Sequence, residues 1–412
     1  MKLKIFYWAL YDFANSIVLI TFVFYFSQWL VVEHGRPSWW YNGALVVSSV
    51  LFVLTAPVFS RIIDITGKKI AGLRIWTLLS AIAMGIVSLI AVYSDSLDVL
   101  ATVLYTLGMY AYLMCFLYFT PMLNDLSTSR NRGRISGVGQ GANSLGQVAG
   151  LLVTLPFVNG TITLFGEPGR AQALMPSVIL FAFLALPILF LYREDEVVKP
   201  WIQRPHGSRS LIVLFKTILA DKSLAFLFLA YFLFSDALLT FANNFPLYLQ
   251  AVHGASDTLK ALLTVAILGL AAVGAVIFGY ISDRFGHKKT LTAVLVLFSG
   301  IFIAMAFIPT FKILVPIFLF AGILFGPVWG ISRAMVGQLA PPGLLASSFS
   351  YYVVAERFST FIGPAIWSTV LLQVGENAQG YKWALVSLSV ILCFSLLALR
   401  KVAEPPSSVP RT

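Results

Sequence analysis

Long apolar runs recur along the whole chain, and they constrain its fold more than any other feature. Each run has about 20 residues, which is enough for a helix to cross a hydrocarbon layer ~30 Å thick. The chain is 59% hydrophobic and only 11% charged, whereas soluble domains carry about 25% charged residues. A soluble surface cannot be built from this composition. We therefore predict an all-α integral membrane protein.

The runs define twelve predicted spans, numbered here in chain order. Lys2 and Lys4 precede the first run, as basic residues precede a signal peptide. That run is too long for a signal peptide and has no small-residue cleavage site, so we expect a retained first span. The spans cover about residues 7–31, 41–62, 72–93, 98–121, 135–158, 173–192, 222–250, 259–281, 289–309, 313–334, 347–372 and 381–400.

Basic residues are distributed unevenly between the two sides of the predicted membrane. If the N-terminus is cytoplasmic, the outer loops hold only five of the 28 Lys and Arg residues: Arg36, Arg170, Lys260, Lys312 and Lys382. This bias is the positive-inside rule, and it predicts that both termini are cytoplasmic. The net charge of +11 therefore orients the protein and requires no nucleic-acid partner. Compact loops and short tails favour a bacterial inner membrane over a vacuole.

A polar segment, residues 193–221, divides the spans into two sets of six. We predict an N-terminal bundle over 1–192, a cytoplasmic linker over 193–221 and a C-terminal bundle over 222–412. Matched features support an internal duplication. Asp12 lies early in span 1 and Asp236 lies early in span 7. The loops between spans 2 and 3 and between spans 8 and 9 both contain an acid, a glycine turn and a basic pair.

The second of these loops, GYISDRFGHKK, resembles the G-x-x-x-D-R-x-G-[RK]-[RK] motif of the major facilitator superfamily. The first copy, SRIIDITGKK, has Ser60 at the glycine and Ile65 at the arginine. Three further segments, YDFANS at 11–16, residues 119–146 and residues 326–364, resemble the unknown-major-facilitator group. That group includes the vacuolar amino-acid effluxer of autophagy.

The resemblance implies two pseudo-symmetric six-helix bundles that work by alternating access, with spans 1, 4, 7 and 10 lining a central cavity. It also implies that Asp283 accepts hydrogen bonds from the N-terminus of a neighbouring helix and so holds the outward-facing state. The gating motif then comprises Asp64, Gly67, Lys68, Gly279, Asp283, Arg284, Gly286 and Lys288, with Arg333 as a partner of Asp283.

Polar residues in span 1 are candidates for substrate or proton contact. Asp12, Asn15 and Ser16 share one helix face because residues three and four apart are neighbours. An ionised carboxylate in the middle of a membrane helix costs about 2.5–3.5 kcal/mol to insert. Asp12 therefore either faces substrate and a coupling proton or is a structural partner of an adjacent helix. In span 5, Asn143 and Gln147 follow one stripe with Gln140, for which interhelical hydrogen bonding is the favoured interpretation.

The second half offers a similar set of candidates. Asp236 in span 7 is followed by Asn243 and Asn244, and we expect Pro246 to break the helix there. In span 11, Glu356 and Arg357 are ~100° apart on the helix and cannot simply neutralise each other. Asp12 or Asp236 would then pair with Arg357 and leave Glu356 as a proton carrier. A buried structural pair between helices is the alternative.

No nucleophile, zinc-ligand spacing, P-loop or dinucleotide motif stands in a plausible setting, so we predict no enzyme, no metal and no cofactor beyond a possible proton gradient. We expect a monomeric secondary transporter in the lipid bilayer. Its solute would be small and polar or amphipathic, by resemblance an amino acid that is exported. The alternatives are a non-transporting sensor or scaffold with the same fold, and an exporter of lipophilic compounds.

Overall fold

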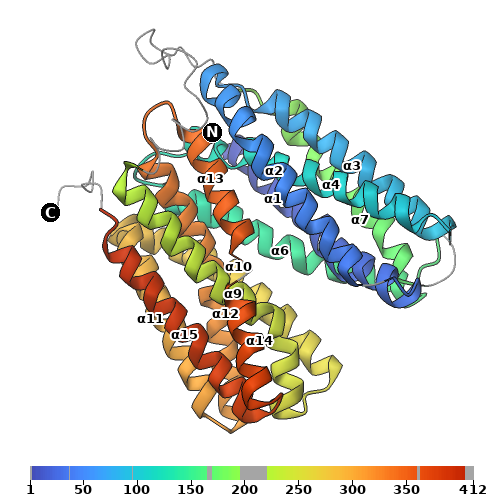
Figure 1. Cartoon of the computed structure of the whole chain (residues 1–412). Coiled ribbons are helices and arrows are strands. Elements are labelled where there is room, and N and C mark those ends of the chain that lie inside the picture. The colour runs from blue at the N-terminus through green and yellow to red at the C-terminus, as the bar shows by residue number, and fades with distance from the viewer. Residues whose placement is uncertain are drawn as a thin grey trace. The chain divides into compact units, whose positions relative to one another are not determined.

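The computed structural model describes residues 2–36, 38–94, 96–164, 169–194, 220–359 and 362–403, without the side chains of 38, 39, 257, 258, 261, 357 and 358. Within these ranges the chain forms helices and short connections and no strand (Figure 1). The predicted linker, 193–221, lies outside the described residues except at its two ends.

The described residues of the first half contain six membrane-length helical segments. Span 1 continues from α1 into two π-helical segments, and spans 4 and 6 likewise end in short additional helices. The elements are α1 (Lys2–Thr21), η1 (Phe22–Phe26), η2 (Trp29–Glu33), α2 (Ser38–Thr66), α3 (Ile70–Tyr93), α4 (Asp98–Phe119), α5 (Met122–Leu126), α6 (Arg132–Val158), α7 (Arg170–Leu186) and η3 (Pro187–Leu191).

In the second half, the part of the chain that the structure describes contains five membrane-length helices and a pair of shorter ones. Side-chain caps mark several starts: Asp221 accepts from the Leu224 N–H at 3.0 Å before α9, and Asn377 caps the last helix in the same way. The elements are α9 (Lys222–His253), α10 (Asp257–Phe285), α11 (His287–Phe307), α12 (Phe311–Leu339), α13 (Leu345–Phe358), α14 (Ile362–Val374) and α15 (Ala378–Arg400).

Eleven helical segments among the described residues are long and apolar enough to cross a membrane. The eleventh predicted span, 347–372, is not continuous but is divided between α13 and α14. Pro364 is the third residue of α14 and has no N–H, which is tolerated in the first turn of a helix, so it favours a helix start here. The preceding Gly363 disfavours a continuous helix.

The predicted break at Pro246 is wrong. α9 continues through Pro246 to His253 and ends at Gly254, which has a left-handed backbone (φ 61°). Membrane helices tolerate an internal proline where neighbouring groups satisfy the backbone. The chain uses this tolerance repeatedly, since α2, α6, α7 and α12 also contain internal prolines.

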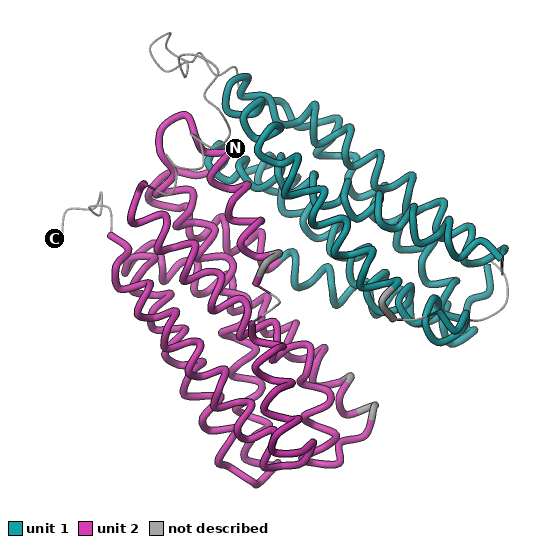
Figure 2. The backbone as a smooth tube through the Cα atoms, in the orientation of Figure 1, with its two compact units in different colours: residues 1–126, 142–205 teal, residues 127–141, 206–412 magenta. Residues whose placement is uncertain are grey.

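The chain divides into two compact units, coloured separately in Figure 2. Unit 1 contains residues 1–126 and 142–205, and unit 2 contains residues 127–141 and 206–412. Helix α6 therefore contributes 132–141 to unit 2 and its remaining residues to unit 1. In unit 1, α1 packs on α7 and α3 packs on α4. In unit 2, α9 packs on α13, α14 and α15, and α10 packs on α12.

Candidate functional site

Asp12 in unit 1 is completely buried and is bound by helix α6. The Asn143 amide donates to Asp12 Oδ1 at 3.0 Å, and the Gln147 amide donates to Asn143 Oδ1 at 2.9 Å. The Ser16 hydroxyl donates to the backbone carbonyl of Asp12 at 2.8 Å, so its one hydrogen is used within α1. The stripe predicted in span 5 thus reaches the acid predicted in span 1 through two amide side chains in series.

Two glycines allow α1 and α6 to approach closely enough for this chain of hydrogen bonds. A Cβ atom on Gly146 would lie 2.2 Å from the carbonyl oxygen of Phe13. One on Gly150 would lie 2.6 Å from Ile20 Cγ2. No side chain fits at either position, so the two backbones are in direct contact, as small residues permit in membrane helices. Asp12 and Asn143 are held in place by this contact.

Asn15 differs from its neighbours in the predicted span 1 set. Its side chain is completely buried, and neither its amide nitrogen nor its carbonyl oxygen has a hydrogen-bond partner among the described residues. A buried unsatisfied polar group costs about 1–3 kcal/mol. Each such group in a native structure needs an explanation, and a bound water, an ion or a functional role can supply one. Asn15 offers one donor group and one acceptor one turn from Asp12.

Asp236 in unit 2 is also completely buried, and it is bound by the backbone of α14. The N–H of Gly363 donates to Asp236 Oδ2. A negative charge at a helix N-terminus is favourable by about 0.3–1 kcal/mol at exposed sites and by up to ~2 kcal/mol where partly buried. Asn243 and Asn244 do not join this contact: Asn243 is exposed, and Asn244 donates to the Thr240 carbonyl at 2.8 Å.

Glu356, the third predicted acid, lies in the last turn of α13 and is half-buried. The hydroxyl of Tyr231 on α9 donates to its Oε2 at 2.7 Å. The Tyr231 ring stacks on Tyr352 with centroids 4.0 Å apart, and the Tyr352 hydroxyl lies 2.9 Å from that of Ser332. Neither tyrosine was predicted as a site residue. The side chain of Arg357 lies outside the described part of the chain, so its predicted pairing with Asp12 or Asp236 stays a prediction.

The carboxylate of Asp283 in the second loop motif binds the N-terminus of α6. Its two oxygens accept from the Gly133 N–H at 2.7 Å and from the Arg134 N–H at 2.8 Å. The charges of Arg132 and Arg134 lie near enough to attract the carboxylate. This is the geometry that the motif predicts for a carboxylate at a helix end. Its role in gating stays a prediction.

The basic residues of the second loop motif, and Arg333, bind partners other than Asp283 in the described contacts. Lys288 donates to the Arg400 and Val402 carbonyls at 3.0 and 2.6 Å and so caps the C-terminal end of α15. Arg333 donates to the side-chain oxygen of Gln140 on α6 at 2.9 Å. Its predicted contact with Asp283 is not among the described contacts and stays a prediction. Arg284 is exposed.

The glycines of the two loop motifs lie in tight turns or at close contacts between helices. Gly67 and Gly286 have positive φ angles of 72° and 100°, a conformation in which glycine is favoured. A Cβ on Gly279 would lie 2.7 Å from the Gly133 carbonyl oxygen. In the first copy, Asp64 is buried and Lys68 is exposed.

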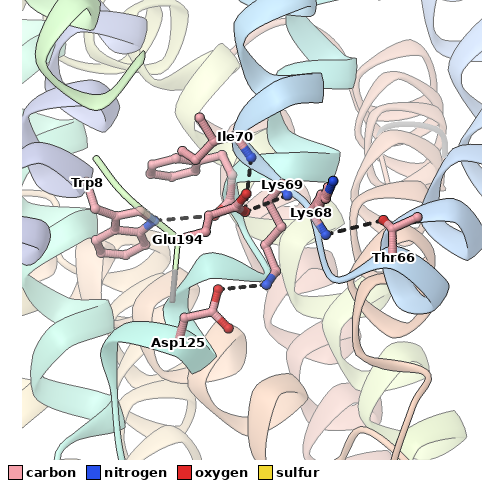
Figure 3. A network of polar contacts seen from close by, with 8 residues as sticks. Trp8, Thr66, Lys68, Lys69, Ile70, Asp125 and Glu194 are labelled. Atoms are coloured by element: carbon pink, nitrogen blue, oxygen red, sulfur yellow. Dashed lines mark hydrogen bonds and ion pairs between the residues drawn. The ribbon is translucent and has the colours of Figure 1, made fainter. Parts of the chain in front are cut away.

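The residue after Lys68 belongs to a network that sequence reasoning missed (Figure 3). Lys69 Nζ lies 2.7 Å from Asp125 Oδ2 on α5. Glu194, just beyond span 6, accepts from the Lys69 N–H at 2.5 Å and from the Ile70 N–H at 3.1 Å, and so caps α3. Arg74 completes the arrangement by donating twice to the Leu189 carbonyl, at 2.9 and 2.6 Å. In each unit, a basic residue near the start of the third helix thus binds the end of the sixth, Arg74 in unit 1 and Lys288 in unit 2.

A second cluster that sequence reasoning missed lies just after the C-terminal end of span 1. Asp98, at the start of α4, is buried. Its oxygens lie 2.9 Å from His34 Nδ1 and 2.6 Å from Arg36 Nε. The cluster connects the segment after η2 to α4. No motif in the sequence indicated these contacts, because they depend on which loop residues meet in three dimensions.

The described residues contain no group of three or more His, Cys, Asp or Glu side chains that could hold a metal. Helices of membrane length with buried acids define a multi-pass membrane protein of the transporter class. A family model described as Major Facilitator Superfamily matches residues 149–364 and 227–412. The chain belongs to this superfamily, whose members are transporters and not enzymes.

Two curated relatives show the range of similarity. Autophagy-related protein 22-2 of Aspergillus niger is 28% identical over 42% of this chain, and the match covers only 31% of that protein. The MFS-type transporter YxiO of Bacillus subtilis is 21% identical over 97% of this chain and 95% of its own length.

Solved structures of the superfamily have the same fold. The Escherichia coli transporter FucP in its outward conformation gives a TM-score of 0.74 with 14% identity, covering 98% of each chain. The human organic anion transporter MFSD10 gives 0.72 with 16% identity, covering 97% of this chain and 99% of its own. The predicted fold class, two six-helix bundles of the major facilitator type, is confirmed.

Proposed function

We propose that this protein is a secondary active transporter that exports a small polar solute, with amino acids as the first candidates, by proton-coupled alternating access. One observation carries the proposal: each unit buries an aspartate of its first helix completely and binds it with an amide. The donor is the Asn143 side chain for Asp12 and the Gly363 backbone for Asp236. Buried acids in membrane helices are costly, and they commonly mark ion pathways and proton relays.

The chemistry of the Asp12 cluster supports an amino group as part of the solute. A carboxylate and three amide side chains, those of Asn15, Asn143 and Gln147, lie on two facing helices of unit 1. Carboxylate and amide oxygens accept hydrogen bonds from an ammonium group. The similarity to the autophagy-related proteins is consistent with this choice, although the match covers less than a third of the longer relative.

The proposed setting is a bacterial inner (plasma) membrane, with both termini in the cytoplasm and the monomer as the working form. The nearly full-length similarity to a Bacillus subtilis protein supports the bacterial membrane. The distribution of Lys and Arg supports the orientation. Reporter fusions at the two termini that gave an outside location would contradict this part of the proposal.

A ligand screen with Asn15 variants tests the proposed site. We would measure thermal shifts of the purified protein with amino acids, nucleosides, sugars and small peptides, for the wild type and for Asn15→Leu. Leucine has a similar size and removes an unsatisfied buried amide, so the variant should be more stable by about 1–3 kcal/mol and should lose the ligand shift. Ser350→Ala, which removes another buried hydroxyl without a described partner, should keep it.

The screen separates the proposed function from its alternatives. A shift with amino acids that disappears in Asn15→Leu supports the proposal. Shifts confined to lipophilic compounds, or an amino-acid shift that survives in Asn15→Leu, would contradict it.

A further inference from the structure

Exposed basic side chains gather at one end of unit 2, where three of its helices begin or end. They lie at the start of α9, at the start of α11 and at the end of α15: Lys222, Lys289, Arg400 and Lys401. We call these four residues the basic corner. Neither the candidate site nor the proposed transport of a solute uses any of them.

Specific contacts hold these three helix ends together. Lys288, at the start of α11, donates to two carbonyls at the end of α15, at 3.0 and 2.6 Å. The Ala403 N–H, just beyond α15, donates to Ser223 Oγ on α9 at 3.0 Å. Lys401 Nζ lies 4.9 Å from the centroid of the Phe226 ring, also on α9. The basic corner is therefore one surface built from three helices, not a run of neighbours in the sequence.

The charges of the basic corner are not neutralised by acids in the part of the chain that the structure describes. The side chains of Lys222, Lys289 and Arg400 make no hydrogen bond or ion pair with any described residue. Two acids precede these helices, and both bind helix N-termini instead. Asp221 caps α9, and Asp283 accepts from two N–H groups of α6.

The corresponding helix ends of unit 1 are built differently, because acids lie among their basic residues. Asp125 Oδ2 lies 2.7 Å from Lys69 Nζ, next to the start of α3. Glu194, just beyond span 6, accepts from two N–H groups at that same start. Unit 1 therefore compensates part of its positive charge at these ends. In the described residues of unit 2, the equivalent charge stays available to an outside anion.

Exposed apolar stripes on α11 and α15, which pack side by side, lead to the basic corner (Figure 1). On α11, Val296 is 52% exposed and lies on the same face as Lys289, seven residues earlier. On α15, Phe394 and Leu397 are 58% and 52% exposed, and Lys401 follows four residues after Leu397 on the same face. Exposed apolar faces of membrane helices contact acyl chains. A lipid lying on these two stripes would bring its headgroup to the basic corner.

We propose that the basic corner binds the headgroup phosphate of an anionic phospholipid whose acyl chains lie on α11 and α15. Clusters of Lys and Arg at the ends of membrane helices recognise anionic headgroups. The Arg400 guanidinium can bind a phosphate through two parallel hydrogen bonds, and the lysines add point charges. Basic side chains that only reach toward the water at the membrane surface would not distinguish anionic from zwitterionic lipids. The proposal goes beyond the proposed transport and does not depend on its solute or its coupling.

Native mass spectrometry of the purified full-length protein tests the proposal by counting bound lipids during a titration in neutral detergent. The probes are phosphatidylglycerol, phosphatidylcholine and glycerol phosphate, which carries the phosphate without acyl chains. Each basic residue near an anionic surface contributes a factor of about five. The wild type should therefore bind phosphatidylglycerol roughly 100-fold more tightly than phosphatidylcholine. Lys289→Gln/Arg400→Gln/Lys401→Gln should retain a preference of about fivefold or less, and glycerol phosphate should not displace the lipid.

A matched variant in unit 1 separates a defined site from a general effect of charge. Lys2→Gln/Lys68→Gln/Arg193→Gln removes three exposed cations at the corresponding helix ends and should keep the wild-type preference. If the unit 2 triple variant does not fold, Lys289→Gln alone should weaken phosphatidylglycerol binding about fivefold. Equal binding of both lipids by the wild type, or equal losses in the two triple variants, would overturn the proposal. Displacement by glycerol phosphate would also overturn it, in favour of a site for a free phosphate.

Discussion

The carboxylate of Asp236 on α9 accepts a hydrogen bond from the backbone N–H of Gly363, the second residue of α14. The two residues are far apart in the sequence and meet because α14 begins where α9 passes. The contact satisfies an N–H that a helix start would otherwise leave unpaired. It also places a charge where the helix dipole favours one.

The close fit at Gly363 predicts a large effect of a small substitution. A Cβ on this residue would lie 2.3 Å from Thr240 Oγ1 and 2.9 Å from Asp236 Oδ2. Gly363→Ala should therefore lower the free energy of unfolding by about 1–3 kcal/mol, the usual cost of overpacking. Thermal unfolding in detergent measures the change. Gly300→Ala is the matched control, since no atom lies within 4 Å of its Cβ position. It should be neutral or stabilising by up to about 1 kcal/mol, and equal effects of both variants would contradict the described packing.

The double contact at Asp283 predicts a loss of stability that is accompanied by a loss of transport. Asp283→Ala removes two hydrogen bonds to the N-terminus of α6 and should cost about 1–2 kcal/mol. The control is Asp221→Ala, which removes one hydrogen bond at the N-terminus of α9 and should cost about 1 kcal/mol. If Asp283 belongs to the gate, only its variant should alter flux in proteoliposomes. Normal flux in Asp283→Ala would remove the gating role and leave a helix cap.

The Lys69–Asp125 pair in Figure 3 predicts a measurable coupling energy. Lys69 is buried, with a side-chain exposure of 8%, whereas Asp125 is 36% exposed. Exposed pairs contribute about 0.2–1 kcal/mol, and the buried lysine places this pair at the upper end of that range. A double-mutant cycle with Lys69→Met and Asp125→Asn, measured by thermal unfolding, should give ~1 kcal/mol. Strictly additive single effects would show that the two side chains are independent.

Local sequence patterns predicted most helices of this fold, but not the division of residues 347–372 into α13 and α14. The apolar runs located the helices, and the glycines at 67 and 286 marked turns that adopt positive φ. Proline was less informative by itself. Pro246 lies inside a continuous helix, whereas Pro364 lies at the start of one. The two prolines differ in their surroundings. Next to Pro364, the N–H of Gly363 donates to the buried carboxylate of Asp236 on α9.

The candidate site residues were also only partly predictable, because their partners depend on the three-dimensional surroundings. The acids Asp12, Asp236 and Glu356 were identifiable because charge is rare in an apolar run. Their donors Asn143, Gly363 and Tyr231 were not identifiable as such, since each pairing joins residues far apart in the sequence. Glu194 and Asp98 were missed for the same reason: both lie near helix ends, where a charged residue attracts no notice.

Gradient-driven solute flux in proteoliposomes tests the central proposal most directly, with the wild type compared to Asp236→Asn. Asparagine keeps an acceptor for the Gly363 N–H but cannot bind and release a proton. We predict that a pH gradient drives solute accumulation in the wild type, and that an ionophore that collapses the gradient abolishes it. Asp236→Asn should still exchange solute across the membrane without a gradient but should accumulate none. Wild-type flux that is indifferent to the gradient, or a variant that still accumulates solute, would contradict the account.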